Sequence, residues 1–205
     1  GIPEDFSHCL PYRYGFGVDV NNPVAYDLTE TYQFMNLCPE LGVKIVNLSA
    51  GSPYYNPHIQ RPAAYPPSDG YQPAYDPLID VARQINAVRQ IKSHLTSNSH
   101  LPSPILVGTA YSYLQEYLPH VAQYVVRNGW TDMIGLGRMV LSYPGVLADA
   151  VEKGALTTKF ICRTFSDCTT APRNGMISGC YPLDKHYSAK PEFQQLKEIK
   201  RKVGA

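Results

Sequence analysis

Two segments of this chain have the pattern of a buried strand that ends in small residues and continues directly into a helix. The first is Ile105–Tyr111, with a helical pattern from Ser112, and the second is Asp132–Arg138, with a helical pattern from Met139. A strand end without bulky side chains lets a phosphate group approach the backbone, and the next helix offers free N–H groups and a positive dipole end. Two such ends on successive β–α units are how a (β/α)8 barrel builds a phosphate site.

Helices and strands alternate along most of the chain with short connections. This alternation predicts parallel βαβ units and therefore an α/β fold. Three strands are evident in the sequence, and a barrel needs eight, so these strands alone cannot close one. We expect strands over residues 43–48, 105–109 and 133–135, and helices over residues 28–38, 77–95, 112–128, 138–149 (with a break at Pro144) and 189–203.

The two strand ends predict an anion-binding site formed by Thr109, Ala110, Gly137 and Arg138. Arg138 adds a positive guanidinium fork whose geometry suits a phosphate. The pair of strand ends therefore indicates a nucleotide-type cofactor. The alternative is a tight turn between strand and helix, with Arg138 on the surface.

A long loop over residues 49–76 is crowded with Pro, Tyr, Gly and Ser. Loops of this length are usually lids or binding loops. Tyr54, Tyr55, His58 and Arg61 are candidates to shape a substrate pocket or contact nicotinamide, and the alternative is that they pack an ordered loop. No Cys or His stands at metal-ligand spacing from His58, so we expect no zinc site.

Composition narrows the classes of partner. The 205 residues can form one sizeable core, and the net charge of +1 gives no reason to expect nucleic acid or an anionic membrane as partner. No apolar run is long enough to span a membrane, and no signal peptide is evident. Five cysteines, odd in number and unevenly spread, fit a reducing compartment better than a disulfide framework. We therefore expect a cytoplasmic location.

Several of these segments together resemble a known family. Residues 43–51 (Val-Lys-Ile-Val-Asn-Leu-Ser-Ala-Gly), 107–110, 135–138 (Gly-Leu-Gly-Arg) and the tail 161–168, followed by Cys180-Tyr-Pro, resemble the C-terminal half of the old yellow enzyme family of NADH:flavin oxidoreductases. Its superfamily includes 2,4-dienoyl-CoA reductase and trimethylamine dehydrogenase. The resemblance implies that residues 1–205 are the C-terminal portion of one FMN-binding (β/α)8 TIM barrel, with residues 161–205 as a tail after the last strand.

The resemblance also implies an activity and a cofactor. In the family, NAD(P)H delivers a hydride to FMN, which passes it to an activated alkene or another acceptor. The seventh and eighth strand ends hold the FMN phosphate, a role that falls here on Thr109 and Ala110 and on Gly137 and Arg138. Many members have Gly at the position of Ala110, and Ala still allows close backbone approach.

The family's first five strands, which supply its flavin-ring contacts, substrate ligands and proton donor, have no counterpart in this sequence. We therefore assign no catalytic residue and expect the isolated chain to be inactive. We expect it to pair with a missing N-terminal half of the barrel or with a second copy of itself, and the completed enzyme to act on a small molecule. The alternatives are a barrel enzyme of other chemistry with a phosphorylated ligand, or a non-catalytic half-barrel binding module.

The cysteine tail resembles the iron–sulfur motif of some superfamily members. Cys162, Cys168 and Cys180 fit the first, third and fourth ligand positions, but Phe165 stands at the second. A phenyl ring cannot bind iron, so we predict no cluster and expect these cysteines to be small buried residues. The alternative is a cluster with a substitute ligand, or another metal.

Overall fold

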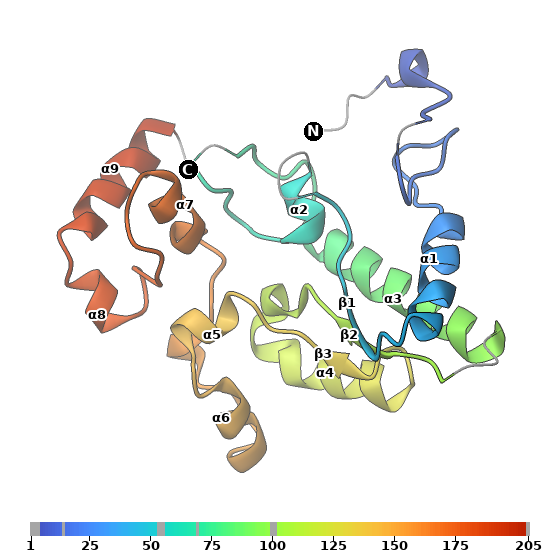
Figure 1. Ribbon diagram of the computed structural model, residues 1–205. Coiled ribbons are helices and arrows are strands. Elements are labelled where there is room, and N and C mark those ends of the chain that lie inside the picture. Colours follow the sequence, from blue (N-terminus) through green and yellow to red (C-terminus); the bar gives the residue numbers. More distant parts are fainter. Residues whose placement is uncertain (1–4, 14, 53–55, 69, 99–101, 204–205) are drawn as a thin grey trace.

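The computed structural model describes residues 5–13, 15–52, 56–68, 70–98 and 102–203 (Figure 1). They form a mixed α/β fold around a three-stranded parallel sheet with the order β1–β2–β3. The predicted alternation of helices with parallel strands is confirmed. The strands are β1 (Ile45–Leu48), β2 (Ile105–Gly108) and β3 (Met133–Ile134), and the helices around them are α1 (Thr29–Glu40) before β1, α3 (Leu78–Asn98) between β1 and β2, and α4 (Leu118–Arg127) between β2 and β3.

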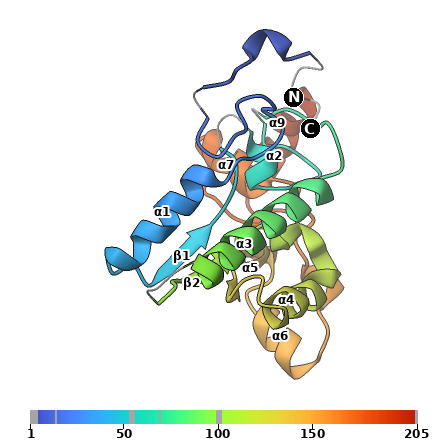
Figure 2. The same ribbon diagram turned by 90° about the vertical axis from the view of Figure 1, so that its right-hand side faces the viewer.

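Helices cover one face of the sheet. Val46 lies beside Leu106 and Gly108 lies beside Ile134, so these alternate residues point to the same side. Helices α1 and α3 pack on that side (Figure 2). Helix α4 packs against β3. The buried cluster between α1, α3 and the sheet consists of Met35, Cys38, Ile91, Leu95 and Leu106.

The opposite face of the sheet is exposed. Ile45 is 59% exposed, Ile105 37% and Met133 51%. The strand register places these three side chains on the side away from the helices. The prediction of a buried strand over residues 43–48 is therefore wrong for one face, because β1 has apolar residues on both faces and the described residues cover only one.

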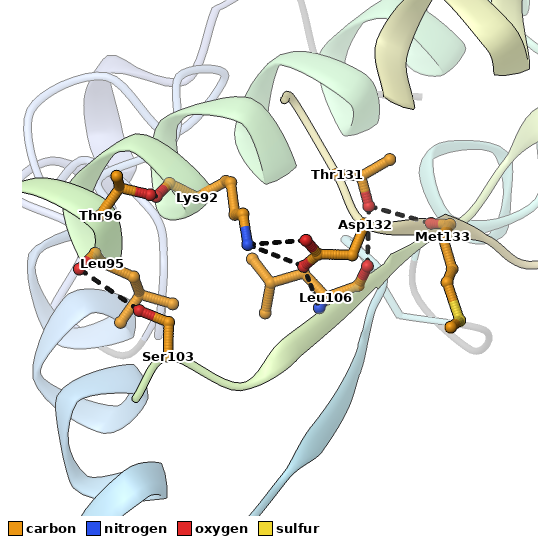
Figure 3. A network of polar contacts seen from close by, with 8 residues as sticks. All are labelled: Lys92, Leu95, Thr96, Ser103, Leu106, Thr131, Asp132 and Met133. Carbon is orange, nitrogen blue, oxygen red and sulfur yellow. Dashed lines mark hydrogen bonds and ion pairs between the residues drawn. The ribbon is translucent and has the colours of Figure 1, made fainter. Parts of the chain in front are cut away.

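A polar network ties the N-terminal ends of β2 and β3 to α3 (Figure 3). The Asp132 carboxylate accepts hydrogen bonds from the Leu106 backbone N–H and the Lys92 ammonium, both at 2.8 Å. The buried Thr131 hydroxyl lies 2.9 Å from the carbonyl oxygens of both Leu106 and Met133. These contacts fix the register of β3 against β2 at the end of the sheet away from the candidate site.

The single tryptophan lies where α3, α4 and β3 meet. The Arg89 guanidinium stands 4.4 Å from the centroid of the Trp130 ring, and the Tyr124 ring meets it edge-on at 5.3 Å. Arg89 comes from α3 and Tyr124 from α4, so the indole bridges both helices just before β3 begins. The ring also packs against a second core cluster, which consists of Tyr111, Leu118, Val125, Met139, Tyr143, Val146 and Ile161.

Two predicted helices, over residues 112–128 and 138–149, are divided in the structure. Gln115 interrupts the first because its φ of 52° lies in the left-handed region, which a helix cannot contain. Pro144 lies at the break of the second, as the sequence predicts. The pieces are the 3-10 turn η2 (Tyr111–Tyr117) before α4, and α5 (Met139–Ser142) before α6 (Val146–Glu152), which projects from the body at the bottom of Figure 1.

The loop and the tail contain helices that the sequence analysis missed. The tail packs around its own small core to one side of the sheet (Figure 1). No helix within the described ranges has both the length and the apolar character needed to cross a bilayer. The additional elements are η1 (Ser7–Cys9), α2 (Pro57–Gln60) in the loop, η3 (Thr158–Phe160), α7 (Asp167–Arg173) and α8 (Lys185–Ser188), and the predicted terminal helix is α9 (Glu192–Val203).

Candidate functional site

The C-terminal ends of β2 and β3 lie side by side. The Gly135 backbone N–H donates to the Gly108 carbonyl at 2.7 Å, which continues the pairing just beyond β3. A Cβ at Gly135 would stand 3.3 Å from a Val107 methyl and 3.5 Å from the Thr109 methyl, so the approach of the two strands favours glycine. A Cβ at Gly137 would meet nothing within 4 Å. The two strand ends therefore share one edge, and the backbone of the second faces open space.

Ala110 makes the turn from β2 into η2 in the left-handed conformation, with φ of 77°. This conformation costs a residue with a Cβ about 1–2 kcal/mol. Such strain persists where the surrounding structure holds the backbone in place, and it is commonest at functional sites. The positive φ also supplies a physical reason for glycine at this position.

The Thr109 side chain holds the strand ends together. Its hydroxyl lies 2.8 Å from the Leu48 carbonyl at the end of β1 and 3.1 Å from the Gln84 side-chain oxygen. One hydroxyl has one proton to donate, and here both acceptors belong to the protein. Any ligand contact at position 109 would therefore come from the backbone.

Gln84 is a residue of the site that the sequence analysis missed. It lies on α3, is 2% exposed, and contacts the segments that follow β1 and β2. Val81 and Val88 are buried on the same side of the helix. A polar residue within this apolar stripe was the available signal, because a buried amide needs hydrogen-bonding partners.

The Arg138 side chain is half-buried. Its Nη2 donates to the Pro62 carbonyl at 2.8 Å. Burial lowers the pKa of the guanidinium, and the neighbouring thiols of Cys162 and Cys168 act in the opposite direction. The cation therefore sits in a poorly solvated place beside a neutral carbonyl, and an anionic ligand would stabilise it.

A hollow of about 220 Å³ brings Arg138 together with two loop residues predicted for the substrate pocket, His58 and Arg61. Arg61 donates to the Thr169 hydroxyl at 3.1 Å. The other two predicted pocket residues, Tyr54 and Tyr55, lie outside the described residues. The lining consists of Pro57, His58, Arg61, Ala63, Pro66, Pro67, Arg138 and Ser166, so Thr109, Ala110 and Gly137 do not line it.

His58 is held by packing within this loop. Its side chain is buried, Nε2 hydrogen-bonds the Tyr71 carbonyl, and the ring meets the Tyr71 ring edge-on at 4.8 Å. These contacts fix the imidazole. Arg61 and Arg138 are the arginines among the residues that line the hollow.

Cys162, Cys168 and Cys180 line a second hollow, of about 320 Å³, which Arg138 also lines. Burial raises the pKa of the Cys180 thiol to about 11 and also raises that of Cys162. Phe165 lines the same hollow, and its ring lies 5.6 Å from the Tyr65 ring. Within the described residues, no group of three or more His, Cys, Asp or Glu side chains is arranged to hold a metal ion. The absence of an iron–sulfur cluster stays a prediction.

Comparison of the chain with known protein families, with curated proteins and with solved structures finds no match. The adjacent strand ends, the open space at Gly137 and the half-buried Arg138 fit a phosphate group.

Proposed function

We propose that this chain provides the phosphate end of the FMN site in a flavin-dependent oxidoreductase. The observation that carries the proposal is the adjacency of the β2 and β3 ends, with exposed backbone at Gly137 and the left-handed turn at Ala110. The resemblance of the sequence to the old yellow enzyme family is the reason to propose FMN as the cofactor. Backbone N–H groups at Ala110 and Gly137 would bind the phosphate, and Arg138 would add its positive charge.

We further propose that the sheet is the C-terminal portion of a (β/α)8 barrel. Parallel sheets are almost always covered on both faces, and here Ile45, Ile105 and Met133 are exposed on one face. Large apolar residues are also exposed on and just after α1, where Phe34 is 56% and Leu41 69% exposed. Further strands and helices, from the rest of the polypeptide or from another chain, would cover these surfaces and supply the flavin-ring contacts.

In the completed enzyme, each part of this chain has a limited task. FMN, when bound, supplies hydride transfer from NAD(P)H to an activated alkene or another acceptor. Ala110, Gly137 and Arg138 bind and orient the cofactor by its phosphate. Arg61, beside Arg138 in the smaller hollow, would attract an anionic part of a substrate or of the hydride donor. The proton donor would come from outside this chain.

Flavin fluorescence anisotropy tests the proposal by comparing FMN with riboflavin, which lacks the phosphate. We expect weak binding, and a preference for FMN of about tenfold from charge-assisted hydrogen bonds. Gly137→Asp should abolish the preference, because it places a carboxylate at the anion site. Gly145→Asp is the matched control, because a Cβ there also meets nothing within 4 Å.

Equal binding of FMN and riboflavin by the wild-type chain would overturn the proposal. So would a Gly137→Asp chain that keeps the wild-type preference. If inorganic phosphate and ribose 5-phosphate bind as well as FMN to a form of the protein with a complete barrel, the site belongs to a barrel enzyme of other chemistry. A complete form that shows flavin absorption bands supports the oxidoreductase.

A further inference from the structure

We infer that Gln84 is the positioning residue of the phosphate site, because its amide joins the three segments that surround the C-terminal edge of the sheet. This inference rests on the proposed function. Gln84 is 2% exposed, and its side chain contacts the segment after β1, the segment after β2 and α2. It would act on the ligand through the backbone that it holds, without touching the phosphate.

The orientation of the amide is determined by its partners. Nε2 donates to the carbonyls of Ile59 and of Gln60, the latter at 3.2 Å, and a carbonyl can only accept. Oε1 must therefore face the donors, which are the Ala50 N–H at 3.3 Å and the Thr109 hydroxyl at 3.1 Å. A flipped amide would face the Ala50 N–H with its own NH2 group and the carbonyls of Ile59 and Gln60 with its oxygen, so the orientation shown is the stable one.

The contact with Thr109 acts directly on the strained turn. Ala110 follows Thr109 in the chain, and its left-handed conformation needs outside support. Gln84 and the Leu48 carbonyl together hold the Thr109 side chain, and so they hold the backbone from which the Ala110 N–H would reach the phosphate. Without the amide, we expect this turn to sample other conformations and the site to lose affinity.

Two substitutions separate positioning from general stability. Gln84→Met keeps the length of the side chain and removes its hydrogen bonds. Gln84→Glu keeps its shape, and burial raises the pKa of the new carboxyl, so that it can donate at about pH 5 and is ionised at about pH 8. Gln90→Glu is the control, because Gln90 lies on the same helix and donates to the Tyr26 hydroxyl, away from the strand ends.

Sulfate is the probe, because its double negative charge is constant across this pH range. Its dissociation constant is measured from shifts of the backbone amide resonances of Ala110 and Gly137. We expect Gln84→Met to bind about tenfold more weakly at both pH values. Gln84→Glu should approach wild-type affinity at the lower pH and lose about tenfold at the higher. Gln90→Glu should follow the wild type at both.

The outcomes distinguish this inference from the proposed function. A folded Gln84→Met chain that binds sulfate like the wild type overturns the inference, as does a Gln84→Glu chain whose affinity relative to wild type is independent of pH. If sulfate leaves the wild-type resonances unshifted, the proposed function fails. Amide hydrogen exchange then decides the positioning role: Gln84→Met must accelerate exchange over residues 48–51 and 109–111, and unchanged exchange refutes it.

Discussion

At Ala110 the backbone adopts a conformation that favours glycine, with φ of 77°. We therefore expect Ala110→Gly to raise the free energy of unfolding by about 1 kcal/mol, because it removes the contact between Cβ and the backbone. Urea denaturation measures the change. The control is Ala148→Gly in the exposed part of α6, which should lower stability by about 1 kcal/mol. A loss of stability in Ala110→Gly would contradict the strain described here.

The lowered pKa of the Asp149 carboxyl leads us to expect that the free energy of unfolding falls in acid. Hydrogen bonds from Lys153 and then from the Tyr143 hydroxyl lower the pKa of its carboxyl from 3.8 to about 2. A carboxyl whose pKa is lower in the folded state stabilises the protein above its unfolded value and loses that contribution as pH falls toward the folded value. Stability should therefore fall as the pH drops from 3.8 toward about 2.

Urea midpoints measured across this pH range test the role of Asp149. Asp149→Asn should flatten the decline, because an amide does not titrate. Lys153→Met should move the decline to higher pH, because the strongest cause of the lowered pKa is removed. An identical acid decline in Asp149→Asn and the wild type would show that other carboxyl groups are responsible.

Among the secondary-structure elements, the hydrogen bonds of Asp132 should stabilise the sheet without affecting ligand binding at the candidate site. Asp132→Ala removes hydrogen bonds to the Leu106 N–H and to Lys92, and we expect it to lower the free energy of unfolding by about 2 kcal/mol. The FMN preference over riboflavin should not change in the folded variant, because the network lies at the opposite end of the strands. Denaturation and flavin titration of the same sample separate the two effects.

The control for this network is Asp76→Asn, which changes an exposed carboxylate that accepts from the Leu78 N–H at the start of α3. We expect Asp76→Asn to lower the free energy of unfolding less than Asp132→Ala does, because the Asp76 carboxylate and the Leu78 N–H are both near solvent. An Asp132→Ala chain as stable as Asp76→Asn would show that the network does not hold β3 in register.

How much of the architecture could be predicted differs between elements. Apolar runs that end in small residues, together with helix-capping and helix-stopping residues, located β1, β2, β3 and the helices between them. The 3-10 turn η2 could not be predicted, because the unusual φ of Gln115 accompanies a hydrogen bond that its side-chain oxygen accepts from Arg163, 48 positions along the chain. Helix α2 has four residues, and a single turn carries no periodic signal.

For the whole molecule, the exposed apolar face of the sheet leads us to expect that copies of the chain associate with one another. Ile45 and Met133 are 59% and 51% exposed on a face that parallel sheets normally cover. We expect the wild-type chain to self-associate, and the double variant Ile45→Lys with Met133→Lys to sediment as a smaller species. Ile177→Lys is the control, because Ile177 is 61% exposed in the tail, away from the sheet. A wild-type chain that is monomeric at high concentration would contradict this expectation.

The geometry of the candidate site could be predicted only where it depends on local sequence. Strand ends rich in small residues are a local signal, so the sequence alone places Ala110 and Gly137 just after β2 and β3. The direction of the Arg138 side chain depends on the Pro62 carbonyl, and the role of Gln84 depends on Ile59 and Ala50. These partners come from distant segments, and no local pattern reveals them.

The position of Trp130 makes it an intrinsic fluorescence probe for one part of the chain. Its indole lies between Arg89 and Tyr124, so its emission reports on the packing of α3 and α4 beside β3. The tail packs around Tyr181 and Leu196 and contains no indole. Melting of the tail alone would therefore lower the far-ultraviolet circular dichroism and leave the emission spectrum unchanged. Coincident curves from the two signals would show that sheet and tail unfold as one cooperative unit.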